Sequence, residues 1–342
     1  MHQEHQEDLM MRAMVLHQQD EIENSPLRLE EVEQPQPGPG QIRIKVAACG
    51  LCRTDLHIAE GDLPLHKQPV IPGHQISGTV DATGDGVTTF STGDHVGIAW
   101  LHETCGQCRF CKKDNENLCL NGSFTGWDVD GGYAEFAVVG EEWAYPLPDG
   151  IDFVDATPLL CGGIVGYRAL KMTLPGPGRH IGMYGFGNSA HINIQVARYL
   201  GCEVYVFTRT DRHKRHAEEL GAVWVGEVPD VPPRPLDASI MFAPAGKLVP
   251  EALKALDRGG ILVLGGIYMS PIPEMDYSTC LWDEHVIRSV ANATREDGEE
   301  LLRYAAEIPV TTNTVTFPLE EVNEALLKMK RSELTGDAVI IP

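Results

Sequence analysis

The sequence lacks long apolar segments and is poor in basic residues. No apolar run reaches the roughly 18 residues that a membrane span needs, and no charged and then apolar signal peptide opens the chain. Asp and Glu number 49 against 27 Lys and Arg, which gives a formal net charge of −22. A chain this acidic repels phosphate backbones, so we expect neither a membrane nor a nucleic acid as its partner.

Internal repeats and low-complexity segments are also missing, and the nine cysteines cannot all pair with one another. In a chain without a signal peptide, cysteines are expected to be thiolate ligands before disulfides, which indicates a reducing cytoplasm. The 342 residues suffice for two domains, each with its own core. Residues 1–12 are polar and aperiodic, and they predict a disordered tail.

Two patterns divide the remaining chain. From about residue 38 to about residue 150, short alternating segments such as 41–46 are separated by Gly-rich turns, which predicts a mostly β domain. Beyond residue 159, strands alternate with helices, which predicts α/β structure with a doubly wound parallel sheet. The expected strands are 180–184, 203–207, 237–242, 261–264 and, near the end, 338–341; the expected helices are 192–200, 250–256 and 295–306.

Four cysteines lie close together with the spacing C-x2-C-x2-C-x7-C. They are Cys105, Cys108, Cys111 and Cys119. Zn²⁺ prefers four tetrahedral ligands, so four thiolates close its coordination shell and leave no position for a substrate. The spacing therefore predicts a structural metal site. An iron–sulfur cluster also uses four thiolates, and the spacing leaves that alternative open.

A second set of metal-ligand residues is spread over the first half of the chain. The segment 49–57 contains Cys49, Cys52 and His57, a further histidine, His74, follows Pro72 and Gly73, and Cys161 lies near the start of the α/β pattern. Two thiolates and one imidazole make a three-ligand zinc site with its fourth position open. Taken singly, each residue has another interpretation, as a hydrogen-bonded structural histidine or a small buried cysteine.

A glycine-rich turn joins the expected strand 180–184 to the helix after it. Gly185, Gly187 and Ala190 form a G-x-G-x-x-A pattern, whose glycines let the backbone approach the pyrophosphate of a dinucleotide at the helix N-terminus. An NAD enzyme normally has an acid about twenty residues further on. This chain has Thr208 and Arg209 there, which favours NADP, although Asp211 leaves NAD as an alternative.

Together and in this order, the motifs resemble the zinc-containing medium-chain alcohol dehydrogenases, specifically the bacterial and yeast branch. The resemblance runs from about residue 13 to the C-terminus. It implies a GroES-like, mostly β catalytic domain at 13–163 and 296–342, and a Rossmann cofactor domain at 164–295. Similar enzymes of this length are usually homotetramers, sometimes dimers.

The resemblance also implies a role for each motif residue. Cys52, His74 and Cys161 would hold a catalytic zinc, and the four-cysteine group a structural one. Asp55 would orient His74, Thr54 would hydrogen-bond the alcohol oxygen, and His57 would exchange its proton with solvent. Trp100 would line the substrate pocket. The residues expected to bind the cofactor are Arg53, Gly185, Gly187, Asn188, Thr208, Arg209 and Ile267.

The expected reaction is hydride transfer between a nicotinamide cofactor and an alcohol or aldehyde. Three alternatives remain. A polyol dehydrogenase of the same superfamily would normally have Glu instead of Cys161, and a zinc-free reductase would lack Cys52 and His74. A non-catalytic structural derivative would tend to lose Thr54 or a zinc ligand. The sequence retains all of these residues. One departure from the family is Gln75, where a glutamate usually follows the zinc histidine.

Overall fold

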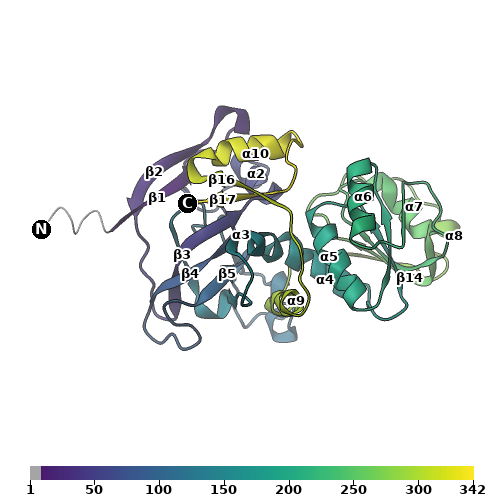
Figure 1. Ribbon diagram of the computed structural model, residues 1–342, viewed down its shortest axis with the longest axis horizontal. Coiled ribbons are helices and arrows are strands. Elements are labelled where there is room, and N and C mark those ends of the chain that lie inside the picture. Colours follow the sequence, from purple (N-terminus) through teal and green to yellow (C-terminus); the bar gives the residue numbers. More distant parts are fainter. Residues whose placement is uncertain (1–8) are drawn as a thin grey trace, which may run out of the picture. The chain divides into compact units, whose positions relative to one another are not determined.

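The computed structural model describes residues 9–342, which form two compact units (Figure 1). The first unit contains the described residues up to Cys161, together with Thr294–Leu302 and Thr312–Pro342. The second unit contains Gly162–Ala293 and Arg303–Thr311. The chain therefore leaves the first unit and returns to it, and α9 (Arg295–Glu307) begins in one unit and ends in the other.

A seven-stranded sheet is the framework of the first unit. Its order is β16-β17-β3-β4-β5-β9, with β8 also pairing with β3. Only the pair β16–β17 is parallel among these described strands. The first six residues of β3 alternate between buried and more exposed, because one face of the strand packs on the core. The bounds are β3 Gln41–Gly50, β4 Gln75–Thr83, β5 His95–Ile98, β8 Phe136–Gly140, β9 Ala144–Pro146, β16 Thr314–Pro318 and β17 Asp337–Ile341.

The chain becomes a strand earlier than the sequence pattern predicts. Of the expected tail, residues 1–8 lie outside the described residues, but β1 (Met10–Leu16) already includes residues 10–12. These residues pair antiparallel with the end of β2 (Leu27–Glu33). Met11 is buried between two exposed neighbours, Met10 and Arg12. The expectation of a tail over these three residues was wrong because a two-stranded ribbon buries only every second side chain there.

Short elements complete the first unit. β6 (Leu101–Glu103) and β7 (Ser123–Phe124) pair with one another on either side of the four-cysteine segment. The α-helices are α2 Arg53–Glu60, α3 Phe153–Ala156 and α10 Val322–Lys330. The 3-10 helices are η1 Ile22–Asn24, η2 Cys111–Lys113, η3 Glu116–Leu118, η4 Glu141–Trp143, η5 Thr157–Leu160 and η7 Leu319–Glu321.

The second unit contains a six-stranded, all-parallel sheet in the order β12-β11-β10-β13-β14-β15. Counted from β10, this is the order 3-2-1-4-5-6 of a Rossmann sheet, which confirms the predicted fold. Strands β10 and β11 have the predicted limits, whereas β12 and β15 were not predicted. The bounds are β10 His180–Tyr184, β11 Glu203–Phe207, β12 Trp224–Gly226, β13 Leu236–Met241, β14 Leu256–Leu264 and β15 Val286–Ser289.

Helices cover both faces of this sheet, with α4 and α5 on one side and α7 and α8 on the other in Figure 1. None of the helices in the described part of the chain has the length and apolar character of a membrane span. The helices are α4 Gly162–Met172, α5 Asn188–Tyr199, α6 Asp211–Glu219, η6 Gly246–Leu248, α7 Val249–Lys254 and α8 Tyr277–Cys280.

Candidate active site

The N-terminus of α2 positions two of the predicted site residues at once. Cys52 is the N-cap, and its sulfur accepts a hydrogen bond from the backbone N–H of Thr54 at 3.3 Å. Asp55 Oδ2 accepts one in return from the Cys52 N–H at 2.8 Å. This reciprocal pattern is a capping box, in which two otherwise unpaired helix donors are satisfied. The local sequence therefore holds the thiol of Cys52 and the carboxylate of Asp55 in fixed positions.

His74 lies in the loop that leads into β4. The preceding Gly73 has a φ of +94°, and a Cβ there would lie 2.7 Å from the Tyr133 ring and 2.9 Å from the Cys49 sulfur. Only glycine fits such a position. The loop then places His74 Nδ1 3.2 Å from Asp55 Oδ1, with both side chains fully buried. A carboxylate at this distance from the ring nitrogen can orient a metal-binding histidine.

The other ring nitrogen of His74 faces two sulfur atoms. Nε2 lies 3.4 Å from Cys52 Sγ and 3.4 Å from Cys161 Sγ. Cys161 follows η5, so the three residues come from a helix start, a loop and a helix end. All three donor atoms lie within 4.8 Å of one another. Two sulfurs and one imidazole nitrogen that converge in this way fit a zinc ion with an open fourth position.

The charges around these atoms also suit a cation. Burial disfavours a charge on His74, but the Asp55 carboxylate and Cys52 outweigh it and raise the pKa of His74 to about 10. The contact with Cys161, together with burial, raises the pKa of the Cys52 thiol well above its ordinary value. Both shifts mean that protons supply positive charge between Asp55 and the two sulfurs, and one divalent cation can take the place of these protons.

Aromatic side chains lie next to the zinc ligands. The Trp100 ring contacts the His74 ring edge-on, with centroids 5.0 Å apart, and it stacks on Phe124 at 5.1 Å and Trp127 at 5.9 Å. Trp100 had been expected from the sequence as a pocket wall; its two partners had not. Gln75, the residue that departs from the family pattern, is buried at the start of β4, directly after His74.

The four-cysteine lobe brings its sulfur atoms together within one short segment. Cys105 Sγ lies 3.5 Å from Cys119 Sγ and 4.0 Å from Cys111 Sγ, and Cys108 Sγ lies 3.5 Å from Cys111 Sγ. Backbone N–H groups point at these sulfurs, including that of Cys108 toward Cys105 at 3.3 Å. The N–H groups of Cys111 and Leu120 lower the pKa of Cys108 to about 6. The pKa of Cys105 is also lowered, whereas burial raises that of Cys119 to about 11. Four sulfurs gathered in this way fit a closed four-thiolate zinc site.

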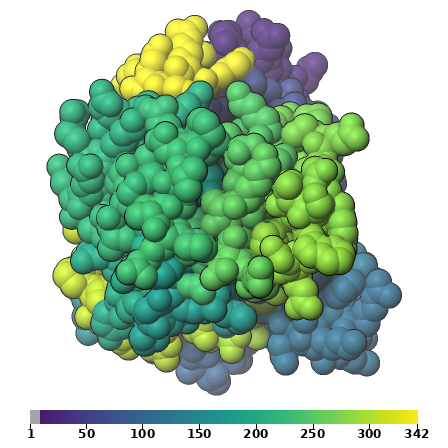
Figure 2. Space-filling model, turned by 90° about the vertical axis from the view of Figure 1, so that its right-hand side faces the viewer, coloured from purple at the N-terminus to yellow at the C-terminus, as the bar shows by residue number. Residues whose placement is uncertain are grey.

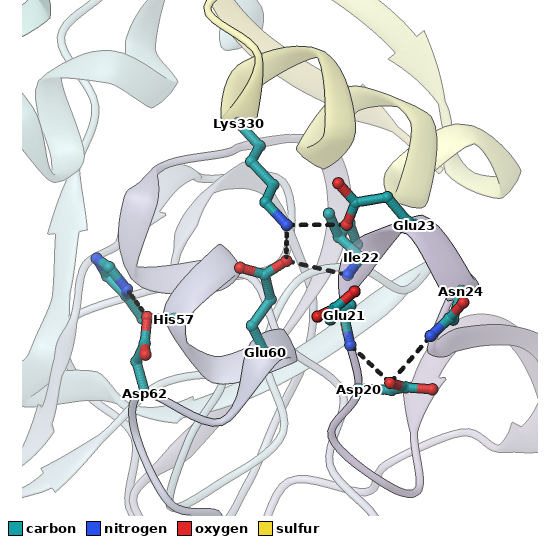
Figure 3. Close-up of polar contacts among 9 residues, drawn as sticks. All are labelled: Asp20, Glu21, Ile22, Glu23, Asn24, His57, Glu60, Asp62 and Lys330. Atoms are coloured by element: carbon teal, nitrogen blue, oxygen red, sulfur yellow. Dashed lines mark hydrogen bonds and ion pairs between the residues drawn. The ribbon is translucent and has the colours of Figure 1, made fainter.

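The other predicted residues of α2 lie on its first two turns. Thr54 is partly buried, and Arg53, the first helical residue, is exposed. His57 lies one turn beyond Thr54, so the two side chains share a face of the helix. The His57 ring is 26% exposed, and its Nδ1 lies 2.7 Å from Asp62 Oδ2 (Figure 3). The sequence analysis had not included Asp62.

In the second unit, the glycine-rich turn has the shape that a dinucleotide needs. Gly185 has a φ of +90°, and a Cβ there would lie 2.9 Å from the backbone nitrogen of Ala243. A Cβ at Gly187 would instead project into open space in front of α5, which begins at Asn188. Backbone that can be approached at a helix N-terminus is where a pyrophosphate binds.

A cavity of about 520 Å³ adjoins this turn. It lies where β10, β11 and β13 end, at the reversal of strand order where such sheets bind their ligands. Thr208 and Arg209 line it, but Ile267, also predicted to bind the cofactor, is 65% exposed and does not. Besides Arg209, the basic side chains that line the cavity are His213 and Lys247.

Comparison with known proteins agrees with this architecture. Residues 38–149 match the family model described as an alcohol dehydrogenase GroES-like domain. The chain is 44% identical to the probable alcohol dehydrogenase AdhA of Mycobacterium tuberculosis over 97% of each chain. It is 35% identical to an alcohol dehydrogenase of Geobacillus stearothermophilus, over 92% of this chain and 96% of that one. A thermostable alcohol dehydrogenase from Pyrobaculum aerophilum matches in structure, with a TM-score of 0.87 and 26% identity over 97% of this chain and 100% of the other.

This chain belongs to the zinc-containing medium-chain alcohol dehydrogenases. It is an NAD(P)-dependent oxidoreductase that acts on CH–OH groups. Its catalytic zinc site consists of Cys52, His74 and Cys161, and its structural zinc site is the four-cysteine lobe. The family assignment thus excludes three alternatives that the sequence had left open: an iron–sulfur cluster, a polyol dehydrogenase and a non-catalytic derivative.

Three further cysteines of the dehydrogenase, Cys49, Cys202 and Cys280, are buried and belong to neither site. The residues that sequence analysis missed, Asp62, Phe124 and Trp127, carry no local signal. An aspartate in a turn and an aromatic side chain near a strand are ordinary, and only their contacts with His57 and Trp100 give them a functional position.

Proposed function

We propose that this alcohol dehydrogenase transfers hydride between NADP and an alcohol or aldehyde, with Thr54 and His57 moving the proton. The observation that carries the proposal is that His74 Nε2 lies close to the sulfurs of Cys52 and Cys161. Cys52 caps α2, the helix that also contains both proton-transfer residues. A bound zinc ion is a Lewis acid that polarises the oxygen of the substrate. The hydroxyl of Thr54 accepts the proton of the alcohol and donates its own onward.

His57 is suited to take up that proton. It shares a helix face with Thr54, and its partly exposed ring can exchange the proton with solvent. Thr54→Ala removes the hydroxyl and should lower kcat by roughly a hundredfold, since a positioned acid–base group contributes that much or more. Assays at 340 nm with alcohol and aldehyde, together with zinc analysis, test the role. An unchanged kcat in Thr54→Ala would remove that residue from the mechanism.

The preference for NADP rests on the cavity in the second unit. Arg209 is exposed at its edge, directly after the neutral Thr208, where an NAD enzyme has an acid. One carboxylate does line the cavity, but Glu227 is held by Lys214 at 2.6 Å. A 2′-phosphate would therefore meet a guanidinium that can bind it through two hydrogen bonds. An NADP preference would favour aldehyde reduction in a reducing cell interior.

Arg209→Ala tests this preference. A charge-assisted contact of about 1.5–3 kcal/mol corresponds to a loss of roughly tenfold to a hundredfold in kcat/KM for NADP, with little change for NAD. Thr208→Asp should go further, because its carboxylate accepts from the ribose hydroxyls of NAD and repels the phosphate. Lys247→Ala is the matched control, because it removes another cation that lines the same cavity. A wild-type enzyme that already prefers NAD, or an equal loss with both cofactors, would contradict the proposal.

We assign the remaining cofactor contacts as predicted from the sequence, with Gly185, Gly187 and Asn188 at the pyrophosphate. Arg53 supplies a cation to it, and Ile267 is a further cofactor contact. In the same proposal, residues 13–163 and 296–342 form the catalytic domain and 164–295 the cofactor domain. The open backbone at Gly187 and the exposure of Arg53 support these roles.

We further propose a homotetramer in the cytoplasm. Several large apolar side chains of the second unit are exposed near its edge strand β15, including Tyr277 at 62% and Trp282 at 66%. Figure 2 shows this yellow-green part of the chain on the surface. Exposed apolar side chains beside a strand with one free edge favour association of identical chains. Sedimentation of the wild type and of Trp282→Glu tests the assembly, and a monomeric wild type would refute it.

A further inference from the structure

The structure gives His57 a partner that the predicted proton path does not include. Its Nδ1 lies 2.7 Å from Asp62 Oδ2, and Figure 3 shows the aspartate reaching back to the ring from the turn after α2. An ionised carboxylate can only accept a hydrogen bond, so Nδ1 must carry the proton of this contact. In the neutral imidazole, Nε2 is then the nitrogen with a free lone pair.

The turn that carries Asp62 is fixed on both sides. Gly61, at a φ of +91°, ends α2, and the N–H groups of Gly61 and Leu63 both donate to the carbonyl of His57 at 3.1 Å. Two bonds of this kind are typical of a helix that ends at a left-handed glycine. The side-chain amide of Gln19 donates to the carbonyls of Ile58 at 2.7 Å and Leu63 at 2.6 Å. Asp62 is therefore held close to His57 by its own backbone.

The glutamate two residues before Asp62 is engaged elsewhere. Glu60, on the same helix, accepts from Lys330 at 2.8 Å and from the backbone N–H of Ile22 at 3.0 Å. Lys330 also donates to Glu23 at 2.8 Å, so it binds both glutamates (Figure 3). The carboxylate that contacts the His57 ring is that of Asp62.

We propose that Asp62 is a positioning residue for His57. It keeps the ring in one orientation and one tautomer, with Nε2 ready to receive the proton, and its negative charge stabilises the imidazolium that forms. The same arrangement of carboxylate and imidazole orients the base in hydrolases. This inference rests on the proposed role of His57 in proton transfer. It adds a residue to that path which contacts neither the zinc ligands nor Thr54.

The test is a set of variants made in the full-length zinc-loaded enzyme, with hydride transfer followed in single turnovers. Asp62→Ala should slow alcohol oxidation by about tenfold with little change in KM, a fraction of what an acid–base group contributes. Asp62→Asn keeps a neutral acceptor for Nδ1 and should recover roughly a third of that loss or more. Glu60→Gln is the matched control, because it removes a carboxylate from the same helix that does not contact His57.

The same variants in a His57→Gln background separate positioning from folding. Asp62→Ala should then have no further effect, because the two residues act as a unit. An equal loss in both backgrounds, or no loss in the wild-type background, would overturn the proposal.

Nitrogen-15 spectra of the histidine rings provide a readout that does not depend on activity. We expect the neutral His57 to carry its proton on Nδ1, and Asp62→Ala to release it to Nε2. If His57→Gln leaves hydride transfer unchanged, the proton path of the proposed function fails first. A spectrum in which Asp62→Ala changes nothing would instead reject the contact itself.

Discussion

The two zinc sites of this dehydrogenase are built in opposite ways. The four-cysteine lobe takes every ligand from residues 105–119, and local backbone N–H groups point at its sulfurs. The catalytic site takes its ligands from Cys52, His74 and Cys161, which are far apart in the chain and meet through the fold. A short local segment therefore positions the ligands of the first site, whereas the surrounding sheet and helices position those of the second.

This difference matches what each site must do. A closed shell of four thiolates contributes folding energy, because it orders the segment that carries its ligands. The catalytic site leaves the fourth coordination position of its zinc open. It also brings the buried imidazole of His74 next to the buried carboxylate of Asp55. The buried Asp55, which is not a ligand, contacts both the His74 ring and the backbone N–H of Cys52 there.

Breaking the catalytic site should produce the largest effect. Cys52→Ser should remove one of two zinc ions per chain and lower kcat by about a thousandfold or more, since a Lewis acid is worth several kcal/mol. The thermal stability should change little. Zinc analysis and the assay at 340 nm measure both outcomes. Cys49→Ser is the control, because Cys49 is buried nearby but belongs to neither site. Active wild-type protein with a single zinc would refute the two-site assignment.

Breaking the lobe should affect stability first. Cys108→Ser should lower Tm by roughly 5–10 °C, because an opened structural site no longer orders its segment. The catalytic zinc should remain, and hydrogen exchange should increase over residues 105–119. Calorimetry and mass spectrometry measure these changes. If this variant is as stable as the wild type, the lobe does not have the structural role that its geometry indicates.

Acid should lower the stability of the fold by a smaller amount, through the strand that precedes the four-cysteine lobe. His102, on the strand before Cys105, is buried, and burial lowers its pKa from 6.5 to about 4. Between these values the unfolded chain binds a proton that the folded chain does not. Stability is therefore complete above pH 6.5 and falls as the pH drops toward 4. At pH 5 the free energy of unfolding should be lower by about 2 kcal/mol because of this histidine.

Urea unfolding of His102→Asn at pH 7 and pH 5, with excess zinc present, checks this contribution. The variant should lose less stability on acidification than the wild type, by about 2 kcal/mol. His17→Asn is the control, because His17 is largely exposed beside Glu30. The same pH response in the wild type and in His102→Asn would show that this histidine does not limit the acid stability.

Much of the architecture followed from local pattern. The limits of β10 and β11, the glycine turn after β10 and both ligand sets were predicted, because strand periodicity, turn chemistry and metal-ligand spacing are local properties. The start of β1 was not, because its exposed residues Met10 and Arg12 alternate with buried ones on a ribbon whose partner lies some twenty residues on. Periodicity over so short a segment is weak.

The sequence by itself determined what kinds of ligand this protein offers, four clustered thiolates and a Cys–His–Cys set, since residue identity decides metal chemistry. Only the tertiary structure decided which side chains surround them. Asp62 contacts His57 because a glycine turns the chain back, and Trp127 stacks on Trp100 because β6 and β7 pair. Such contacts depend on the positions of whole elements in space. Residue spacing along the chain does not predict these contacts, because they form only when the sheets and helices pack.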